Sequence, residues 1–497
     1  MTVSRRQLLT GGAAGVGLAV AGSLPAFAGG TGPSSRDGDR PGTGRPFPPL
    51  EDDPAGLLAL PAGFRYRVVT RTGQTSLSGG LGKTPGDHDG TAAFAGGHDR
   101  LRLVQNHELE SWDNEFGVPH APGTVYDTGA ENGGGCTVIE TDGEGRNHGE
   151  RVGISGTLTN CAGGQTPWGT WLTCEETETR AGTGWSADGH SGTYRKDHGY
   201  VFEVFPDPSV RPVPVPIKAF GRYAHEALAV SPDRARVYLS EDASGPNGLF
   251  YRWTAPSGVR LGPGFASRLG PTAGRLEAMK IVLDDGSVLP DVAYITSAQL
   301  GRPFRVRWVE VPERDGTTTS VRKQFADGQV TRGKKFEGVF GTRSGAYVVN
   351  SFAFEDGDLP ADAVKHDGLV WFYDYDHQTI TLVTYFPHQD SAETGATPRY
   401  SDMTFDGPDN VTVTPWGTLV LAEDGLGASH VLSSVPGGPT YAIARNQLNI
   451  GTAAEPEFSE FTGPTFSPDG RVLFVNIQVP GVTLAITGPW EKYLGGR

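Results

Sequence analysis

The feature that most constrains the fold of this chain is a turn followed by a short β-rich run, which recurs along the sequence. Its clearest copies begin at residues 166–170, 231–234, 414–418 and 467–470. The copies at 166–170 and 414–418 share the sequence TPWGT, and each reaches an acidic pair at the same distance from its proline. Repeated units of this kind are typical of β-propellers, whose blades are small antiparallel sheets. We therefore predict an all-β fold made of a single β-propeller.

Composition and spacing support this fold class. The chain has 72 glycines and 37 prolines, and its apolar residues come in short bursts without a long 3.6-residue period. Neighbouring units lie 53 to 65 residues apart, measured from Pro415 to Pro468 and from Pro167 to Pro232. This spacing predicts about six or seven blades in the available length.

The repeated units end in acidic residues, which bear on function. If these runs are the inner strands of blades, their ends meet at one mouth of the central channel. The acids concerned are Glu175, Glu176, Glu241, Asp242, Glu423 and Asp424. Carboxylates gathered this closely repel one another unless cations lie between them. The alternative is that these acids are solvated strand ends.

A cysteine stands just before the first acidic pair. Cys161 lies in a glycine-rich turn, and the following strand delivers Glu175 and Glu176. A thiol beside carboxylates is a poor nucleophile but a suitable metal ligand, for iron rather than calcium. The alternatives are a buried thiol or half of a disulfide. With three cysteines, at least one lies outside any intramolecular disulfide, and a Cys136–Cys174 bridge stays open.

Other segments combine the same residue types. Asn106-His107-Glu108 follows an apolar run, and His225-Glu226 precedes one. Lys335 stands two residues before Glu337, and Asp409 lies in a turn rich in oxygen ligands. The two histidines are candidates for metal ligands or acid–base groups. Their alternative role is that of hydrogen-bonded structural residues.

The N-terminus predicts export. Arg5 and Arg6 precede an apolar run that ends near Ala28 in a small-x-small cleavage pattern, as in twin-arginine (Tat) signals. The alternative is an ordinary secretory signal with coincidental arginines. We expect a signal peptide at 1–28, a disordered linker at 29–48 and the propeller at 49–497, with the Tat translocase as an export partner. No later stretch is apolar enough for a membrane span.

Charge narrows the choice of partner. The formal net charge is −15, and about −17 without the two signal arginines. A chain without excess Lys and Arg is a poor nucleic-acid binder, whereas many carboxylates suit cation binding.

Together, these motifs resemble the PhoX alkaline phosphatases. The resemblance rests on the Tat signal, Asn106–Glu108, the stretch 160–176, residues 221–226 and residues 462–478. It implies a six-bladed propeller with an iron and calcium cluster at the channel mouth, a secreted or periplasmic location, and hydrolysis of small phosphate monoesters. The implied metal ligands are Cys161, Glu108, Glu175, Glu176, Glu226, Glu241, Asp242, Glu337, Asp409, Glu423 and Asp424.

The same resemblance assigns the substrate contacts. It implies that Lys335 and Asn106 bind phosphate, and that Lys335 serves catalysis. Two departures stand out: Val138 occupies the place of an asparagine, and Lys335 that of an arginine. Lysine holds phosphate as a point charge without the bidentate fork of arginine, and valine donates no hydrogen bond.

Two other functions remain open on the sequence. A calcium-dependent lactonase or esterase on a propeller would not need Cys161, so a fully active Cys161→Ala protein would favour it. In a non-catalytic propeller, calcium would only join blade ends, and no phosphoester would be hydrolysed. We expect a monomer in each case.

Overall fold

The recurrent turn connects two antiparallel strands. In the computed structural model, residues 166–170 join β8 (Asn160–Gln165) to β9 (Trp171–Glu175). The Thr166 hydroxyl accepts the Thr170 amide N–H at 2.9 Å, and Gly169 adopts a φ of 82° that suits a residue without a side chain. The structure describes residues 44–97, 99–113, 115–351, 365–388, 404–425 and 427–495.

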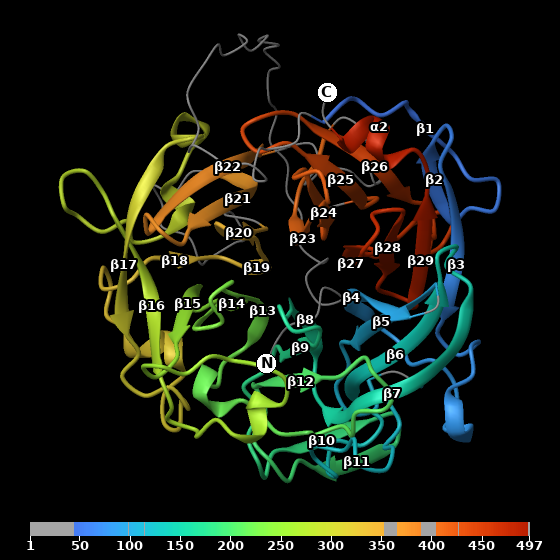
Figure 1. Cartoon of the computed structure of the whole chain (residues 1–497), viewed down its shortest axis with the longest axis horizontal. Helices are drawn as coiled ribbons and strands as arrows, with labels where there is room; N and C mark the ends of the chain where they lie inside the picture. Colours follow the sequence, from blue (N-terminus) through green and yellow to red (C-terminus); the bar gives the residue numbers. More distant parts are fainter. Residues whose placement is uncertain are drawn as a thin grey trace.

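The described strands form antiparallel sheets arranged around a common centre, which is a propeller-like, all-β architecture (Figure 1). One sheet contains β4 (His88–Gly97), β5 (Arg100–His107), β6 (Gly134–Asp142) and β7 (Asn147–Thr157). The next contains β8, β9 and β12 (Val201–Val204), with the hairpin β10 (Gly184–Ala187) and β11 (His190–Thr193) beside it in sequence.

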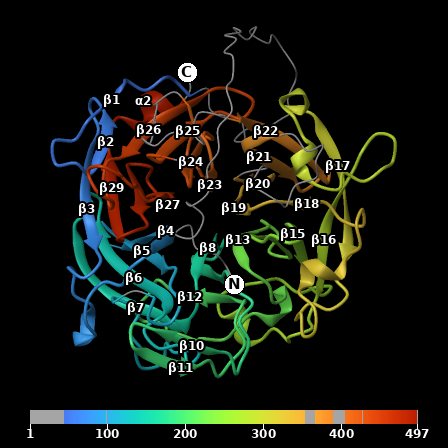
Figure 2. The same ribbon diagram turned by 180° about the vertical axis from the view of Figure 1, so that it is seen from behind.

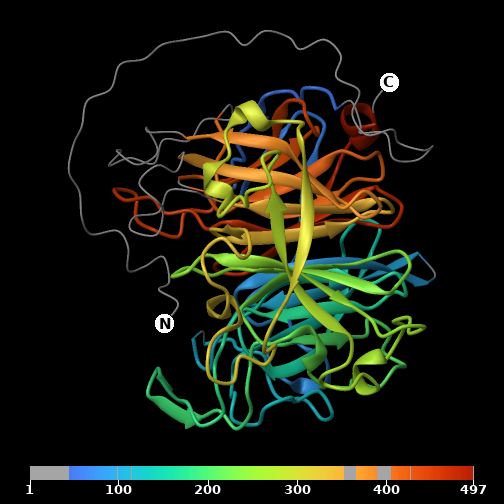
Figure 3. The same ribbon diagram turned by 90° about the vertical axis from the view of Figure 1, so that its left-hand side faces the viewer.

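A ten-stranded sheet follows. Its first part is β13 (His225–Val230), β14 (Arg236–Glu241), β15 (Gly248–Thr254) and β16 (Arg275–Val282). Its second part is β19 (Phe336–Gly341), β20 (Gly345–Asn350), β21 (His366–Asp374) and β22 (Thr379–Pro387). The strand β17 (Pro303–Glu310) joins β16 to β22 on the outside of the molecule (Figure 3), and β18 (Arg332–Gly333) pairs with β15.

The chain ends close the circle. One sheet runs β1 (Leu50–Glu51), β2 (Leu58–Pro61), β26 (Thr440–Asn446), β25 (His430–Ser434), β24 (Leu419–Glu423) and β23 (Pro408–Val413). The last holds β27 (Phe461–Phe466), β28 (Val472–Ile477), β29 (Val482–Thr487) and the early strand β3 (Arg65–Arg71). N-terminal strands thus complete both C-terminal sheets.

Helix is scarce among the described residues. The one α-helix there is α2 (Trp490–Leu494), whose Trp490 packs on Phe64 and Phe466. The remaining helical turns are 3₁₀ segments: Ser78–Gly80, Lys218–Phe220, Phe265–Ser267, Val292–Tyr294, Ser297–Gln299 and Val321–Gln324. No described helix has the length and apolar character needed to cross a membrane.

The innermost strands surround the centre. They are β4, β8, β13, β19, β23 and β27; each is an edge strand of its sheet and contacts the next around the circle (Figures 1 and 2). The apolar core lies between successive sheets, as where Phe94 and Val104 pack together with Phe202.

One sequence-based expectation was wrong. The runs that follow the recurrent turns, β9, β14, β24 and β28, are the second strands of their sheets and not the innermost ones. The turn reverses the chain between these two strands, so the innermost strand lies before the turn in the sequence. The acids that end the second strands still lie beside the starts of the innermost strands, since the two strands are antiparallel.

Candidate metal centre

A shared strand register defines the site. The first residue of each innermost strand pairs with the last residue of the second strand: His88 with His107, Asn160 with Glu175, His225 with Glu241, Phe336 with Asn350, Pro408 with Glu423 and Phe461 with Ile477. In every pair the register then shifts within the first five residues of the innermost strand. Such bulges re-aim side chains, and they recur beside active sites.

Two equivalent positions follow from this register. The second residue of the innermost strand is Asp89, Cys161, Glu226, Glu337, Asp409 or Thr462. The residue just past the second strand is Glu108, Glu176, Asp242, Ser351, Asp424 or Gln478. We call these twelve residues the strand-end ring. An acid or the thiol holds five of the six first positions, and an acid holds four of the six second positions.

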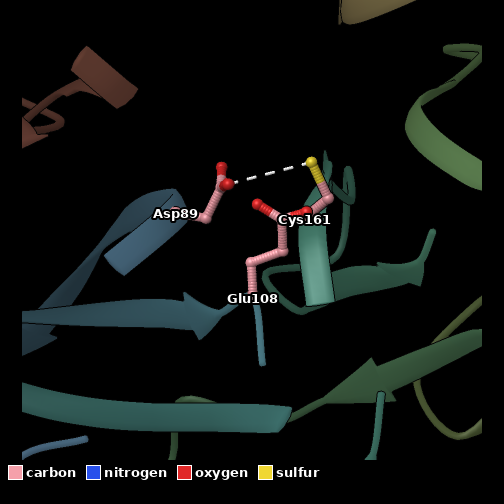
Figure 4. Close-up of side chains that lie close together, drawn as sticks. All are labelled: Asp89, Glu108 and Cys161. Carbon is pink, nitrogen blue, oxygen red and sulfur yellow. Dashed lines mark hydrogen bonds between the residues drawn. The ribbon is translucent and has the colours of Figure 1, made fainter. Parts of the chain in front are cut away.

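Within the strand-end ring, three overlapping groups place potential ligand atoms within 4.8 Å of one another. They are Asp89, Glu108 and Cys161; Cys161, Glu176 and Glu226; and Glu226, Glu337 and Asp409. Cys161 Sγ lies 3.0 Å from Glu226 Oε2 and 3.8 Å from Asp89 Oδ2. Figure 4 shows Asp89, Glu108 and Cys161 converging from three separate chain segments. Cys161 and Glu226 therefore each belong to two groups and link all three.

Electrostatics in this cluster strongly oppose negative charge. Burial and the nearby Asp409 raise the pKa of Asp89 to about 8. Burial and Asp242 raise the pKa of Glu337 to about 7, even though Lys335 acts in the opposite direction. The pKa values of Glu108, Glu176, Glu226, Asp409 and the Cys161 thiol also rise well above their usual range, through burial and mutual repulsion. A cluster of this kind ionises fully at neutral pH only when cations compensate its charge.

The side chains present fit such cations. Asp89 Oδ1 and Glu226 Oε1 are buried, and neither has a hydrogen-bond partner among the described residues. Buried oxygens of this kind are costly unless a ligand satisfies them. Groups that contain Cys161 offer a mixed sulfur and oxygen set, which suits iron. The all-carboxylate group of Glu226, Glu337 and Asp409 suits calcium.

Lys335 supplies a cation at the edge of the cluster. Its Nζ lies 2.8 Å from Glu337 Oε1 and 3.1 Å from Asp242 Oδ2, and its side chain is 24% exposed. Its backbone has a φ of 50°, in the left-handed region that a residue with a side chain rarely adopts. Strained backbone of this type concentrates at functional sites.

Three predicted ligands point away from the strand-end ring. Glu175, Glu241 and Glu423 are the paired residues at the ends of the second strands, one position before the ring. Since side chains alternate along a strand, they point to the side opposite the ring residue that follows each of them. Glu241 accepts from Tyr251 and Arg322, and Glu423 from the amide N–H groups of Asp406 and His430. We therefore leave these three out of the proposed ligand set.

Other predicted residues also serve as structural supports. Asn106 Nδ2 donates to the carbonyl oxygens of Cys161 and Ala162 at 2.8 Å, and its Oδ1 accepts from Trp171, Thr173 and Cys136. Its side chain thus holds the Cys161 strand and faces no open space. His107 and His225 hydrogen-bond to the carbonyl oxygens of Gly86 and Gly221.

The remaining sequence expectations concern the three cysteines and Val138. Cys136, Cys161 and Cys174 are all unbridged. Val138 is packed in the apolar core with Phe94 and Val104. The predicted signal peptide lies outside the described residues.

Glu175 takes part in a buried ion network that supports the ring. His198 Nδ1 lies 2.6 Å from Glu175 Oε1, and His198 Nε2 lies 3.2 Å from Asp127 Oδ2. Burial alone would lower the pKa of His198, but Glu175 and Asp127 outweigh it and raise the pKa to about 9. Glu175 also accepts the amide N–H groups of Gly199 and Tyr200, so the network fixes the chain next to Glu176.

This network predicts a pH dependence of stability. A histidine with a raised folded-state pKa stabilises the fold fully below its unfolded pKa near 6.5, and that contribution is lost as the pH rises through about 9. Between these values the free energy of unfolding should fall by about 3 kcal/mol through His198. Denaturant unfolding of metal-loaded protein at several pH values measures it. In His198→Gln this component should vanish, and parallel curves for the two proteins would contradict the network's role.

Sequence reasoning missed part of the ring. Asp89, Ser351, Thr462 and Gln478 lie at ring positions but were not singled out as ligands. The strand register contained the signal for Asp89. Glu226, Cys161 and Asp89 are each the second residue of an innermost strand, in β13, β8 and β4.

A cavity of about 440 Å³ lies within the circle of innermost strands. Its lining includes the residues that directly follow the six ring residues of the innermost strands: Gly90, Ala162, Ala227, Gly338, Asn410 and Gly463. Five of these six residues are glycine or alanine, as the close approach of neighbouring strands requires; a Cβ on Gly338 would lie 2.7 Å from the Asp409 carbonyl oxygen. The ring therefore borders one end of this cavity.

Comparisons with known proteins concern the family and the fold of this chain. A family model described as alkaline phosphatase PhoX matches residues 45–481. The solved structure of Pseudomonas fluorescens PhoX in complex with vanadate, a transition state analogue, is similar with a TM-score of 0.60 and 20% identity, covering 90% of this chain and 98% of that one. A Xanthomonas campestris gluconolactonase matches with a TM-score of 0.37 and 12% identity, covering 90% and 97%. No curated sequence matches this chain.

Proposed function

The chain belongs to the alkaline phosphatase PhoX family and is a phosphoric monoester hydrolase; from this premise we propose that it is an exported, metal-dependent enzyme whose cations are held by the strand-end ring. The observation that carries the proposal is the linkage of three ligand groups through Cys161 and Glu226. Buried acids around one thiol, with pKa values raised by burial and repulsion, destabilise a fold unless cations compensate their charge.

We assign the ligands by donor chemistry. Iron is held by the groups that contain Cys161, with Asp89, Glu108, Glu176 and Glu226 as carboxylate ligands. Calcium is held by Glu226, Glu337 and Asp409, with Asp242 and Asp424 nearby. We also propose that the six innermost strands are the inner edges of a six-bladed propeller over residues 49–497. The twin-arginine segment at 1–28 directs a monomeric enzyme out of the cytoplasm.

The chain's own residues account for substrate binding. Bound cations would neutralise negative charge on the phosphoryl oxygens as the transition state forms. Lys335 binds a phosphoryl oxygen through its ammonium group, and Asp242 and Glu337 hold that group in place. Arg322, which contacts Glu178 and Glu241, anchors the segment that leads to Lys335. This is positioning and charge stabilisation, the main requirement of phosphoryl transfer.

Substitution of Lys335 tests the substrate contact. Lys335→Ala should raise KM for p-nitrophenyl phosphate by about 10- to 100-fold, because a charge-assisted hydrogen bond is lost. Lys335→Arg should retain most of the affinity, since guanidinium also pairs with phosphate. The control is Lys83→Ala, an exposed lysine that donates to Ser76 and Gln74. An unchanged KM in Lys335→Ala would remove Lys335 from the phosphate site.

A further inference from the structure

One strand pair of the ring carries neither an acid nor a thiol. At β27 and β28, the two ring positions hold Thr462 and Gln478. The Thr462 hydroxyl donates to the His88 carbonyl oxygen at 2.7 Å, so its proton is used within the fold. Gln478 is therefore the side chain through which this pair acts on the cluster.

Gln478 contacts two potential ligands at once. Its Nε2 lies 2.7 Å from Glu108 Oε2 and 3.1 Å from Asp89 Oδ2. One primary amide thus uses both of its N–H groups on carboxylates that come from different strands. Asp89 Oδ1 has no hydrogen-bond partner among the described residues.

The backbone on both sides of this contact is fixed. The backbone N–H of Gln478 donates to the Glu460 carbonyl oxygen, and the backbone carbonyl oxygen of Gln478 accepts the His88 N–H. The Asp89 carbonyl oxygen accepts from Asn476 at 2.7 Å and from Gln105 at 3.1 Å. Hydrogen bonds therefore hold the backbones of both Gln478 and Asp89 in place.

The chemistry of an amide suits this position. A carboxylate here would add repulsion to Asp89 and Glu108, and a lysine or arginine would compete with the cation for both. A neutral donor orients the two carboxylates without changing their total charge. Hydrogen bonds to ligating carboxylates are known to tune metal affinity in this way.

We propose that Gln478 is a positioning residue that holds Asp89 and Glu108 together, so that their remaining oxygens and Cys161 Sγ form the iron pocket. The inference deepens the proposed function and rests on it. Gln478 sets the geometry of the thiol-containing half of the cluster, whereas the carboxylate half around Glu337 and Asp409 does not depend on it.

The test compares Gln478→Met, which keeps the length and removes the donors, with Gln447→Met. Gln447 is the matched control because its Nε2 also binds a carboxylate, that of Asp52, at 2.9 Å but away from the ring. The full chain is loaded with iron and calcium. Measurements are iron affinity, calcium content, the thiolate-to-iron absorption band and the temperature of unfolding. Gln478→Met should lose about 10- to 100-fold in iron affinity and shift the absorption band, with calcium retained.

Each outcome either supports or overturns the positioning role of Gln478. Unchanged iron affinity and absorption in Gln478→Met would overturn the positioning role while leaving the proposed function intact. Equal loss of iron and calcium, or the same change in Gln447→Met, would also overturn it, because the effect would then not be specific to the thiol-containing half. Wild-type protein that binds no iron would refute the iron assignment and this inference together.

Discussion

Glu226→Gln should lower kcat/KM for p-nitrophenyl phosphate by about a thousandfold or more. Glu226 belongs to two of the three ligand groups, so its loss disturbs both the thiol-containing and the all-carboxylate sets. Burial and the neighbouring Glu337 raise its pKa well above the usual range. Without metal, the neutral glutamine should therefore make the fold more stable at pH 8. Loss of activity with a gain in metal-free stability identifies a ligand rather than a structural residue.

The control for this substitution is Glu150→Gln. Glu150 is also buried with a raised pKa, but it accepts from the hydroxyls of Thr70 and Thr84 in another part of the fold. Steady-state kinetics and thermal unfolding of both variants, with and without chelator, make the comparison. Wild-type activity in Glu226→Gln, or an equal loss in Glu150→Gln, would contradict the ring as the active centre.

Removal of metal should abolish activity and lower the unfolding temperature at pH 8 by on the order of 10 °C. Without cations, Asp89 and Glu337 have raised pKa values of about 8 and about 7. Acids with raised folded-state pKa values stabilise the fold below their unfolded pKa near 4, and this contribution is lost as the pH rises through the folded values. Chelated protein should therefore become less stable from pH 5 to pH 8.

Metal-loaded protein should show little of this loss, because cations favour the ionised carboxylates. Thermal unfolding across that pH range, before and after chelation, measures the difference. The two forms would have the same pH dependence if the strand-end ring bound no cation. Restoration of the original curve by added calcium and iron would show that chelation itself caused no damage.

Sequence patterns predicted the fold class because the recurrent turn has its own local chemistry. Residues such as Thr166, Gly169 and Thr170 form the turn from nearby hydrogen bonds alone. Which strand is innermost could not be predicted in this way, since strand order within a sheet depends on contacts between distant segments. The acidic runs were consequently placed on the wrong strand of each pair.

The site was predictable to the level of segments but not of side chains. Cys161, Glu226, Glu337 and Asp409 were predicted as metal ligands, and their potential ligand atoms lie in neighbouring groups of the structure. Within each acidic pair, however, alternation decides which carboxylate reaches the ring, and a one-residue step separates Glu176 from Glu175. Asp89 and Gln478 were missed because their roles arise from a register shared by separate strand pairs.

The most direct test of the central claim is the metal content of protein purified from its native source, measured by elemental analysis beside its phosphatase activity. We expect iron and calcium together in fixed proportion to the chain, and parallel loss of iron and activity in Cys161→Ala. Fully active protein that contains calcium without iron would contradict the cluster that we propose.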